Sequence, residues 1–239
     1  VTRKDSGVAW FGCIPEHWRV GRLKHVAQLQ TGPFGSQIHA SDYTINGVPL
    51  VNPAQIQRGR IVPDPNVTVD FETFARLIRH RLRPGDIVCG RRGEIGRLAV
   101  VTEEDDGFLC GTGSIRVRPN AEVVPEYLAC VLSLKGSRDY LVLQSVGSTM
   151  ENLNTTILGN MPVLIPSLPE QHAIIKRISH FSDLVDRAVD AISRSLERLH
   201  ELRSALITAA VTGEIDPDAW RKRGETDRQL EAIEAEVNE

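Results

Sequence analysis

The sequence of 239 residues lacks the features that mark a membrane, secreted or metal-binding protein. It contains no run of roughly 18 apolar residues, so we do not expect a membrane-spanning helix. The polar start at residues 1–5 leads into no hydrophobic signal segment. The four cysteines include no Cys-x-x-Cys pair, which argues against a disulfide framework and against a zinc site. We therefore expect a cytoplasmic protein with reduced thiols and no bound metal.

Aromatic residues are also scarce at 5%, and the formal net charge is -3, which speaks against a nucleic-acid partner if the charge is evenly spread. It is not evenly spread. Residues 1–168 contain 18 Lys and Arg against 16 Asp and Glu, whereas residues 169–239 contain 10 against 15. Within the first part, residues 76–97 contain seven arginines and only two acidic residues. A basic strip therefore lies in a near-neutral body that an acidic segment follows.

The hydrophobic pattern changes near residue 168 and predicts two parts of different structure. Before that point, short runs rich in Val and Ile alternate with Gly, Pro and Asn, a pattern typical of short strands. The expected strands are 48–51, 86–89, 97–101, 114–118 and 161–165, and the expected helices are 126–133 and 137–145. We therefore predict that residues 1–168 form a globular domain of mixed helices and strands, of the α+β class.

From residue 169 to 211, apolar residues recur in steps of three and four, close to the heptad period of coiled coils. A helix of this length would extend about 64 Å, whereas a domain of this size has a radius of gyration of about 15 Å. We therefore favour a coiled-coil partner over a helix lying along the domain. We predict a helical spacer at 169–213 and a charged tail at 214–239. The expected interface residues are Ile178, Phe181, Val185, Ile192, Leu196, Leu199 and Leu206.

No motif predicts catalysis. Asn52-Pro53-Ala54-Gln55 begins like the Asn-Pro-Pro-aromatic box of amino-group DNA methyltransferases, but it lacks the second proline and the aromatic that would stack a flipped base. The glycines at 90–96 are not followed by the Gly-Lys-Ser/Thr of a phosphate-binding loop. Asp86 and Glu94 resemble a metal-dependent nuclease core without its lysine. We expect a chain that is not an enzyme and has no cofactor of its own.

The basic strip is the strongest candidate for a binding surface. On a strand, Arg79, Arg81 and Arg83 would share one face, and Arg91 and Arg92 lie in a glycine-flanked turn. The planar arginine fork binds phosphate and also matches the O6/N7 edge of guanine. The alternative is that these arginines pair with Asp86, Glu94 and residues 103–106 on a solvated sheet.

Two polar, turn-rich segments, 31–39 and 148–155, contain amide and hydroxyl groups that can bind base edges. Together with the basic strip they complete the set of candidate residues. The candidate DNA-binding residues are Ser36, Gln37, His39, Arg79, Arg81, Arg91, Arg92, Thr149, Asn152 and Asn154.

Several stretches make the chain resemble the specificity subunit of type I restriction–modification systems. They are residues 4–18, Leu82-Arg83-Pro84-Gly85-Asp86-Ile87-Val88, residues 91–96, the boundary at 161–171 with Pro166-Ser167-Leu168-Pro169-Glu170-Gln171, and residues 206–215. The boundary is the most specific of these, and together the stretches cover residues 4–215. The likeness extends to one target-recognition domain followed by one helical spacer.

The resemblance implies a non-catalytic subunit that recognises double-stranded DNA and directs adenine methylation and restriction to a bipartite site. It implies methylation subunits that carry S-adenosylmethionine and restriction (translocase) subunits that use ATP, so neither cofactor is expected on this chain. A full family member has two recognition domains and two spacers, whereas this chain has one of each. It is expected to homodimerise through the spacer or to be half of a longer chain. The competing hypothesis is a coiled-coil assembly or regulatory protein that docks on methylation subunits without reading DNA.

Overall fold

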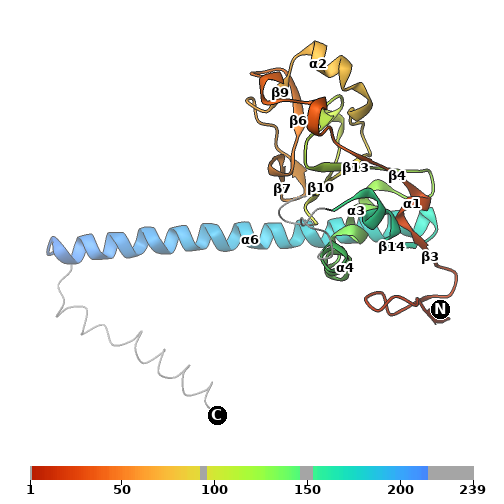
Figure 1. Ribbon diagram of the computed structural model, residues 1–239. Helices are drawn as coiled ribbons and strands as arrows, with labels where there is room; N and C mark the ends of the chain where they lie inside the picture. The colour runs from red at the N-terminus through yellow and green to blue at the C-terminus, as the bar shows by residue number, and fades with distance from the viewer. Residues whose placement is uncertain (1, 92–95, 146–152, 215–239) are drawn as a thin grey trace. The chain divides into compact units, whose positions relative to one another are not determined.

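The protein is described here by a computed structural model that covers residues 2–91, 96–145 and 153–214 (Figure 1). The chain divides into two compact units, Val1–Arg177 and Ile178–Glu239. The first unit ends at Arg177, so it includes the first ten residues of α6 (Leu168–Val211). The border that the sequence predicts, at residue 168, lies at the start of this helix.

The centre of the first unit is a four-stranded antiparallel sheet with the order β11-β10-β13-β4. Its strands are β4 (Ala27–Thr31), β10 (Ile87–Gly90), β11 (Leu98–Val100) and β13 (Ser114–Pro119). Successive residues of β10 pack into different cores, since Ile87 and Cys89 join one cluster and Val88 joins another. Because both faces of β10 are covered, its side chains are apolar on both faces.

The largest hydrophobic cluster packs short helices on one face of this sheet. The elements are α1 (Leu23–Val26), α3 (Pro125–Ser133), α4 (Lys135–Ser145), α5 (Thr155–Asn160) and the strand pair β3 (Arg19–Arg22) and β14 (Pro162–Ile165). Figure 1 shows α3, α4 and β14 close together, on the side of the sheet away from α2. Ile174 and Ile175 of α6 pack against the same cluster.

A second sheet of short strands has the order β12-β6-β9-β5 and its own small core. The strands are β5 (Tyr43–Thr44), β6 (Val48–Val51), β9 (Thr68–Val69) and β12 (Leu109–Cys110), with α2 (Phe71–Arg76) following β9. Leu50, Val69 and Leu109 are fully buried there. Two further pairs are β1 (Arg3–Asp5) with β2 (Cys13–Pro15), and β7 (Ile56–Gln57) with β8 (Arg60–Ile61). Single 3₁₀ turns are η1 (Gly35–Gln37), η2 (Ala40–Asp42), η3 (Pro53–Gln55), η4 (Ile78–His80) and η5 (Glu103–Asp105).

The start of α6 is fixed to the first unit by Gln171, whose side chain is fully buried. Its Nε2 donates to the carbonyl oxygens of Glu122 and Pro166, both at 2.9 Å, and its Oε1 accepts from the backbone N–H of Val124 at 2.8 Å. A buried amide with three partners holds both the loop before α3 and the entry to α6.

Glu170 forms the second part of this attachment. Its carboxylate accepts from the backbone N–H and hydroxyl of Ser167 at 3.0 and 2.7 Å, which caps the first turn of α6. It also accepts from the indole of Trp18 at 3.0 Å and lies 2.7 Å from Nε2 of His17. The Ser167, Trp18 and His17 hydrogen bonds lower the pKa of Glu170 to about 2. The Pro-Glu-Gln boundary of the sequence therefore joins the N-terminal segment to the long helix.

The predicted α+β class and the long helix are confirmed, and each expected strand and helix overlaps an observed one. The sequence did not predict β3, β4 or the strands β5, β9 and β12 of the second sheet; the last three have two residues each, which is too short to show a period. No helix among the described residues combines the length and apolarity needed to span a membrane.

Candidate nucleic-acid interface

The hypothesis that a strand places Arg79, Arg81 and Arg83 on one face is wrong. Arg76 ends α2, which Asp70 caps by accepting from the N–H of Thr73 at 2.8 Å, and the 3₁₀ turn η4 follows. Leu77 and His80 are both buried, at a spacing of three that matches a 3₁₀ turn rather than the alternation of a strand. Arg79, Arg81 and Arg83 therefore do not line one face of a strand. We call residues 76–83 the arginine segment.

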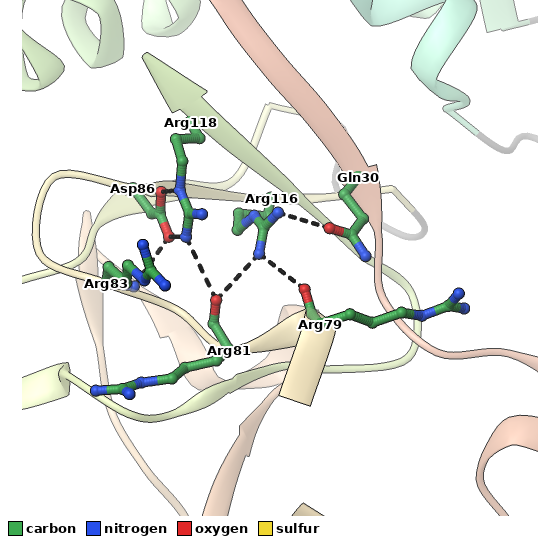
Figure 2. Close-up of polar contacts among 7 residues, drawn as sticks. All are labelled: Gln30, Arg79, Arg81, Arg83, Asp86, Arg116 and Arg118. Carbon is green, nitrogen blue, oxygen red and sulfur yellow. Dashed lines mark hydrogen bonds and ion pairs between the residues drawn. The ribbon is translucent and has the colours of Figure 1, made fainter. Parts of the chain in front are cut away.

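The guanidinium of Arg116 of β13 packs against the backbone of the arginine segment (Figure 2). Its Nη1 donates to the carbonyl oxygens of Arg79 and Arg81, both at 3.0 Å, and its Nη2 donates to Oε1 of Gln30 at 2.6 Å. Burial lowers the pKa of Arg116 from its usual value. Because the two carbonyls point inward to this guanidinium, the side chains of Arg79 and Arg81 extend away from it, as Figure 2 shows.

Arg118, two residues further along β13, forms a bidentate ion pair with Asp86 at 2.7 Å for each bond. Asp86 is 1% exposed and also accepts from the backbone N–H of Arg83 at 2.9 Å. The hydrogen bond to Asp86 raises the pKa of Arg118. Buried Asp86 and Arg116 and half-buried Arg118 form one network that holds the backbone of residues 79–83 (Figure 2).

The outward side chains of the arginine segment differ in their partners. Arg79 is exposed and its Nε donates to Nε2 of His80 at 3.0 Å. Arg81 forms an ion pair with Asp106 at 3.0 Å. The alternative of pairing with residues 103–106 therefore holds for Arg81. Burial, together with the charges of Arg79 and Arg116, lowers the pKa of His80 to about 4, so this imidazole is neutral near pH 7.

The candidate residues of segment 31–39 lie beside the arginine segment. Arg76 donates to the carbonyl oxygen of Gln37 at 2.6 Å and forms an ion pair with Asp42 at 3.1 Å. Ser36 and His39 are exposed, and Gln37 is half-buried in η1. The structure thus brings Gln37 next to Arg76, although 39 residues separate them in sequence.

A second group of candidates is partly described. The backbone N–H of Arg91 donates to the carbonyl oxygen of Gly113 at 2.8 Å, and its carbonyl oxygen accepts from the N–H of Leu153 at 3.0 Å. These bonds place the half-buried Arg91 next to the segment that contains Asn154. Asn154 is exposed and caps α5, with Oδ1 accepting from the N–H of Ile157 at 2.8 Å. The other candidates of this group, Arg92, Thr149 and Asn152, lie outside the described residues.

Sequence reasoning missed the arginines around the β7–β8 hairpin. A cavity of about 650 Å³ lies beside this hairpin. Its lining residues are Ala54, Ile56, Gln57, Arg58, Gly59, Gly96, Arg97, Leu98, Ser133 and Arg138. A weak signal existed, since a glycine in a polar break between the apolar residues Ile56 and Ile61 is compatible with a hairpin turn.

Reactive groups are few among the described residues. No group of three or more His, Cys, Asp or Glu within the described ranges is placed to hold a metal ion. Burial raises the pKa of the Cys89 and Cys110 thiols to about 12, so both remain protonated near neutral pH. These two thiols are packing groups of the core.

The seven predicted spacer residues all lie on α6, and all are exposed in the chain alone. Their exposed fractions run from 37% at Leu206 to 68% at Ile192. A row of large apolar side chains at heptad-like spacing and with this exposure is typical of a helix that packs on another helix.

The family described as "Type I restriction modification DNA specificity domain" matches residues 15–198. The chain is 26% identical over 231 residues to the specificity subunit of the type I restriction enzyme EcoBI of Escherichia coli, covering 93% of this chain and 48% of that one. It is 26% identical over 180 residues to the MjaIX specificity subunit of Methanocaldococcus jannaschii, covering 73% and 40%. The chain thus spans about half the length of the curated relatives that it matches.

Solved structures support the same fold. The chain is similar to the HsdS subunit from Thermoanaerobacter tengcongensis, with a TM-score of 0.59 and 22% identity over 84% of this chain and 46% of that one. It is also similar to a chain from a study of assembly and conformational transition in the type I R-M system, with a TM-score of 0.65, 22% identity, and coverage of 82% and 46%. At this identity the likeness concerns the fold.

Proposed function

Because the chain belongs to the family of type I restriction modification DNA specificity domains, we propose that it is a non-catalytic subunit that recognises double-stranded DNA. It directs adenine methylation and restriction by partner subunits to a bipartite site. S-adenosylmethionine and ATP belong to those partner subunits. The specificity subunits named among its relatives support this proposal.

The observation that carries the proposal is the buried network beneath the arginine segment. Arg116 donates hydrogen bonds to the backbone carbonyls of Arg79 and Arg81, so the side chain of Arg79 faces solvent. The same segment contacts the polar residues 31–39 through the bond from Arg76 to Gln37. An arginine held on a fixed backbone loses less conformational entropy on binding a phosphate or a guanine edge than one on a mobile loop. The arrangement suits a DNA-contacting surface with arginine and amide groups side by side.

Residues of both groups have roles in this proposal. Arg79, Arg81, Arg91 and Arg92 bind phosphates or guanine edges. The side chains of Ser36, Gln37, His39, Thr149, Asn152 and Asn154 bind base edges. Because the Oδ1 of Asn154 already accepts one hydrogen bond at the cap of α5, its amide nitrogen and one further lone pair of Oδ1 remain for DNA.

We further propose that the exposed face of α6 pairs with a second spacer. In a chain of this length the second spacer comes from another copy, so the subunit is a homodimer; in a longer chain it comes from the second half. Two identical recognition domains related by a two-fold axis bind identical half-sites, so the homodimer recognises an interrupted palindrome. Light scattering at micromolar concentration tests this point, and a stable monomer contradicts the homodimer.

Mapping of methylated adenines in cells that express the chain with a methylation subunit is the direct test. The expected result is one sequence motif with two specific halves, absent from cells that express the methylation subunit alone. Methylated adenines without a shared sequence context would contradict the proposal.

The alternative is an assembly or regulatory protein that uses the α6 face to dock on methylation subunits without reading DNA. The same row of exposed apolar residues favours it. Titration of the chain against a random duplex, with and without the methylation subunit, separates the two functions. A DNA reader binds the duplex through salt-dependent phosphate contacts, whereas the assembly protein adds no affinity to that of the methylation subunit.

A further inference from the structure

We propose that the cavity beside the β7–β8 hairpin is a second anion site, which holds a backbone phosphate of the bound DNA through Arg58 and Arg138. The inference rests on the proposed function, because it assumes that the chain binds DNA. It adds a contact that the basic strip does not contain, since neither arginine lies within residues 76–97.

The size and charge of the cavity suit a sugar–phosphate unit. Its volume of about 650 Å³ lies within the range of about 300–1,000 Å³ that small-molecule sites occupy. Three arginines, Arg58, Arg97 and Arg138, are among its lining residues, and no acidic residue is among those described there. Arg58 and Arg138 each bring a guanidinium group to the cavity, and a phosphate binds such groups through charge-assisted hydrogen bonds.

Arg58 is placed at the turn of the hairpin in an unfavourable backbone conformation. Its φ is 50°, followed by 78° at Gly59, so two successive residues have positive φ, as in the tight turns of β-hairpins. Asn or Gly is preferred at such a position. Among the described residues, the other non-glycine residue with positive φ is Asn46. A strained arginine where asparagine would be relaxed points to a role for the side chain.

Arg138 of α4 reaches the same cavity across Gly96. A Cβ atom at Gly96 would lie 2.8 Å from Cγ of Arg138, and Gly96 has a φ of 97°, so the glycine leaves the space that the arginine side chain occupies. The side chains of Arg58 and Arg138 are exposed and make no hydrogen bond or ion pair with residues in the described part of the chain. Arg97 is held differently, with Nη1 donating to the carbonyl oxygen of Pro53 at 3.4 Å.

The remaining lining residues favour a backbone phosphate over a free nucleotide. A free nucleotide is usually bound by an aromatic side chain that stacks its base or by a carboxylate that binds its ribose hydroxyls. The described lining contains neither and consists otherwise of small, aliphatic and neutral polar residues. A phosphodiester needs only the guanidinium donors.

The test is duplex binding by the full chain with the double substitution Arg58→Asn and Arg138→Gln. Asparagine adopts positive φ readily, so Arg58→Asn keeps the hairpin, and thermal unfolding checks that the fold is intact. We expect affinity for a random duplex to fall about tenfold at low salt. The slope of log Kd against log salt should decrease by about 1 for the lost phosphate. Arg3→Ala, which removes an exposed arginine on β1, is the matched control and should change neither value.

Three other outcomes would each contradict a specific claim. A folded double variant with wild-type affinity and slope, in a chain whose affinity Arg79→Ala does reduce, overturns this inference and leaves the proposed function standing. A wild-type chain that does not bind duplex DNA overturns both. If deoxyadenosine monophosphate binds the wild type but not the double variant, and duplex affinity is unchanged, the cavity is a nucleotide site and the phosphate-backbone assignment is wrong.

Discussion

The buried arginines of the first unit and those on its surface have different roles, although they lie close to each other in the fold. Arg116 is 7% exposed and donates three hydrogen bonds to backbone and side-chain oxygens. The side chain of Arg79 is exposed and donates to the neighbouring His80. The buried arginines stabilise the backbone, whereas the surface arginines keep their positive charge accessible to a ligand. A count of basic residues in a segment therefore does not equal the charge available to a ligand.

The largest expected effect comes from breaking the buried ion pair. Asp86→Ala removes the acceptor of the Arg118 guanidinium, whose side chain is 28% exposed, and of the backbone N–H of Arg83. It should reduce the free energy of unfolding by about 2–3 kcal/mol. Asp106→Ala breaks the exposed pair with Arg81 and should cost less than about 1 kcal/mol. Urea unfolding of both variants measures the difference. Equal costs would show that burial does not separate the two kinds of arginine.

Arg116→Met tests the network at its other end. Methionine fills much of the space but donates no hydrogen bond, so the carbonyls of Arg79 and Arg81 lose a donor. We expect a loss of about 2 kcal/mol in unfolding free energy. Duplex affinity should fall as well, because the arginine segment is no longer fixed. A stable variant with wild-type affinity would contradict the supporting role of Arg116.

His80, buried between the two kinds of arginine, should make stability depend on pH. Its pKa is about 4 in the folded protein, against about 6.5 in the unfolded chain. Below pH 6.5 the unfolded state binds a proton that the folded state does not, so stability falls as the pH decreases from 6.5 towards 4. We expect a decrease on the order of 1 kcal/mol between pH 7 and pH 5. The variant His80→Gln should lack this part of the slope, and an identical slope would contradict the assignment.

Arg79→Ala should have the smallest effect on stability and a clear effect on binding. The side chain is exposed, so the free energy of unfolding should change by less than about 0.5 kcal/mol. Duplex affinity should fall several-fold, by about 1 kcal/mol. Binding titrations and denaturation of the same preparation measure both quantities. A variant that loses stability instead of affinity would place Arg79 with the buried arginines.

Local sequence patterns predicted several elements well. The run Ile87-Val88-Cys89 is apolar throughout because β10 is covered on both faces, and the apolar period of α6 predicted a helix that begins within one residue of its observed start. The failure at residues 76–83 has a local cause. Alternation of Leu and Arg suggested a strand, but Asp70 caps a helix there and the chain continues into a 3₁₀ turn.

The candidate site was predicted in part. The sequence identified residues 31–39 and the arginine segment separately, but only the contacts of Arg76 with Gln37 and Asp42 show that the two segments touch. It did not identify Arg58 or Arg138, because each is a single arginine in an ordinary local context. The cavity that joins them exists only once the hairpin, β11 and α4 are packed together.

The sequence by itself determined the class of the domain, the long helix with its apolar face, and the family to which the chain belongs. These features are periodic or depend on short motifs, so residues that are close in sequence are enough to predict them. Only the tertiary structure decided which arginines are structural and which face solvent. That distinction depends on burial and on partners distant in sequence, such as Asp86 for Arg118 and the carbonyl of Arg79 for Arg116. Local pattern carries no information on those long-range contacts, and they set the electrostatic role of each charge.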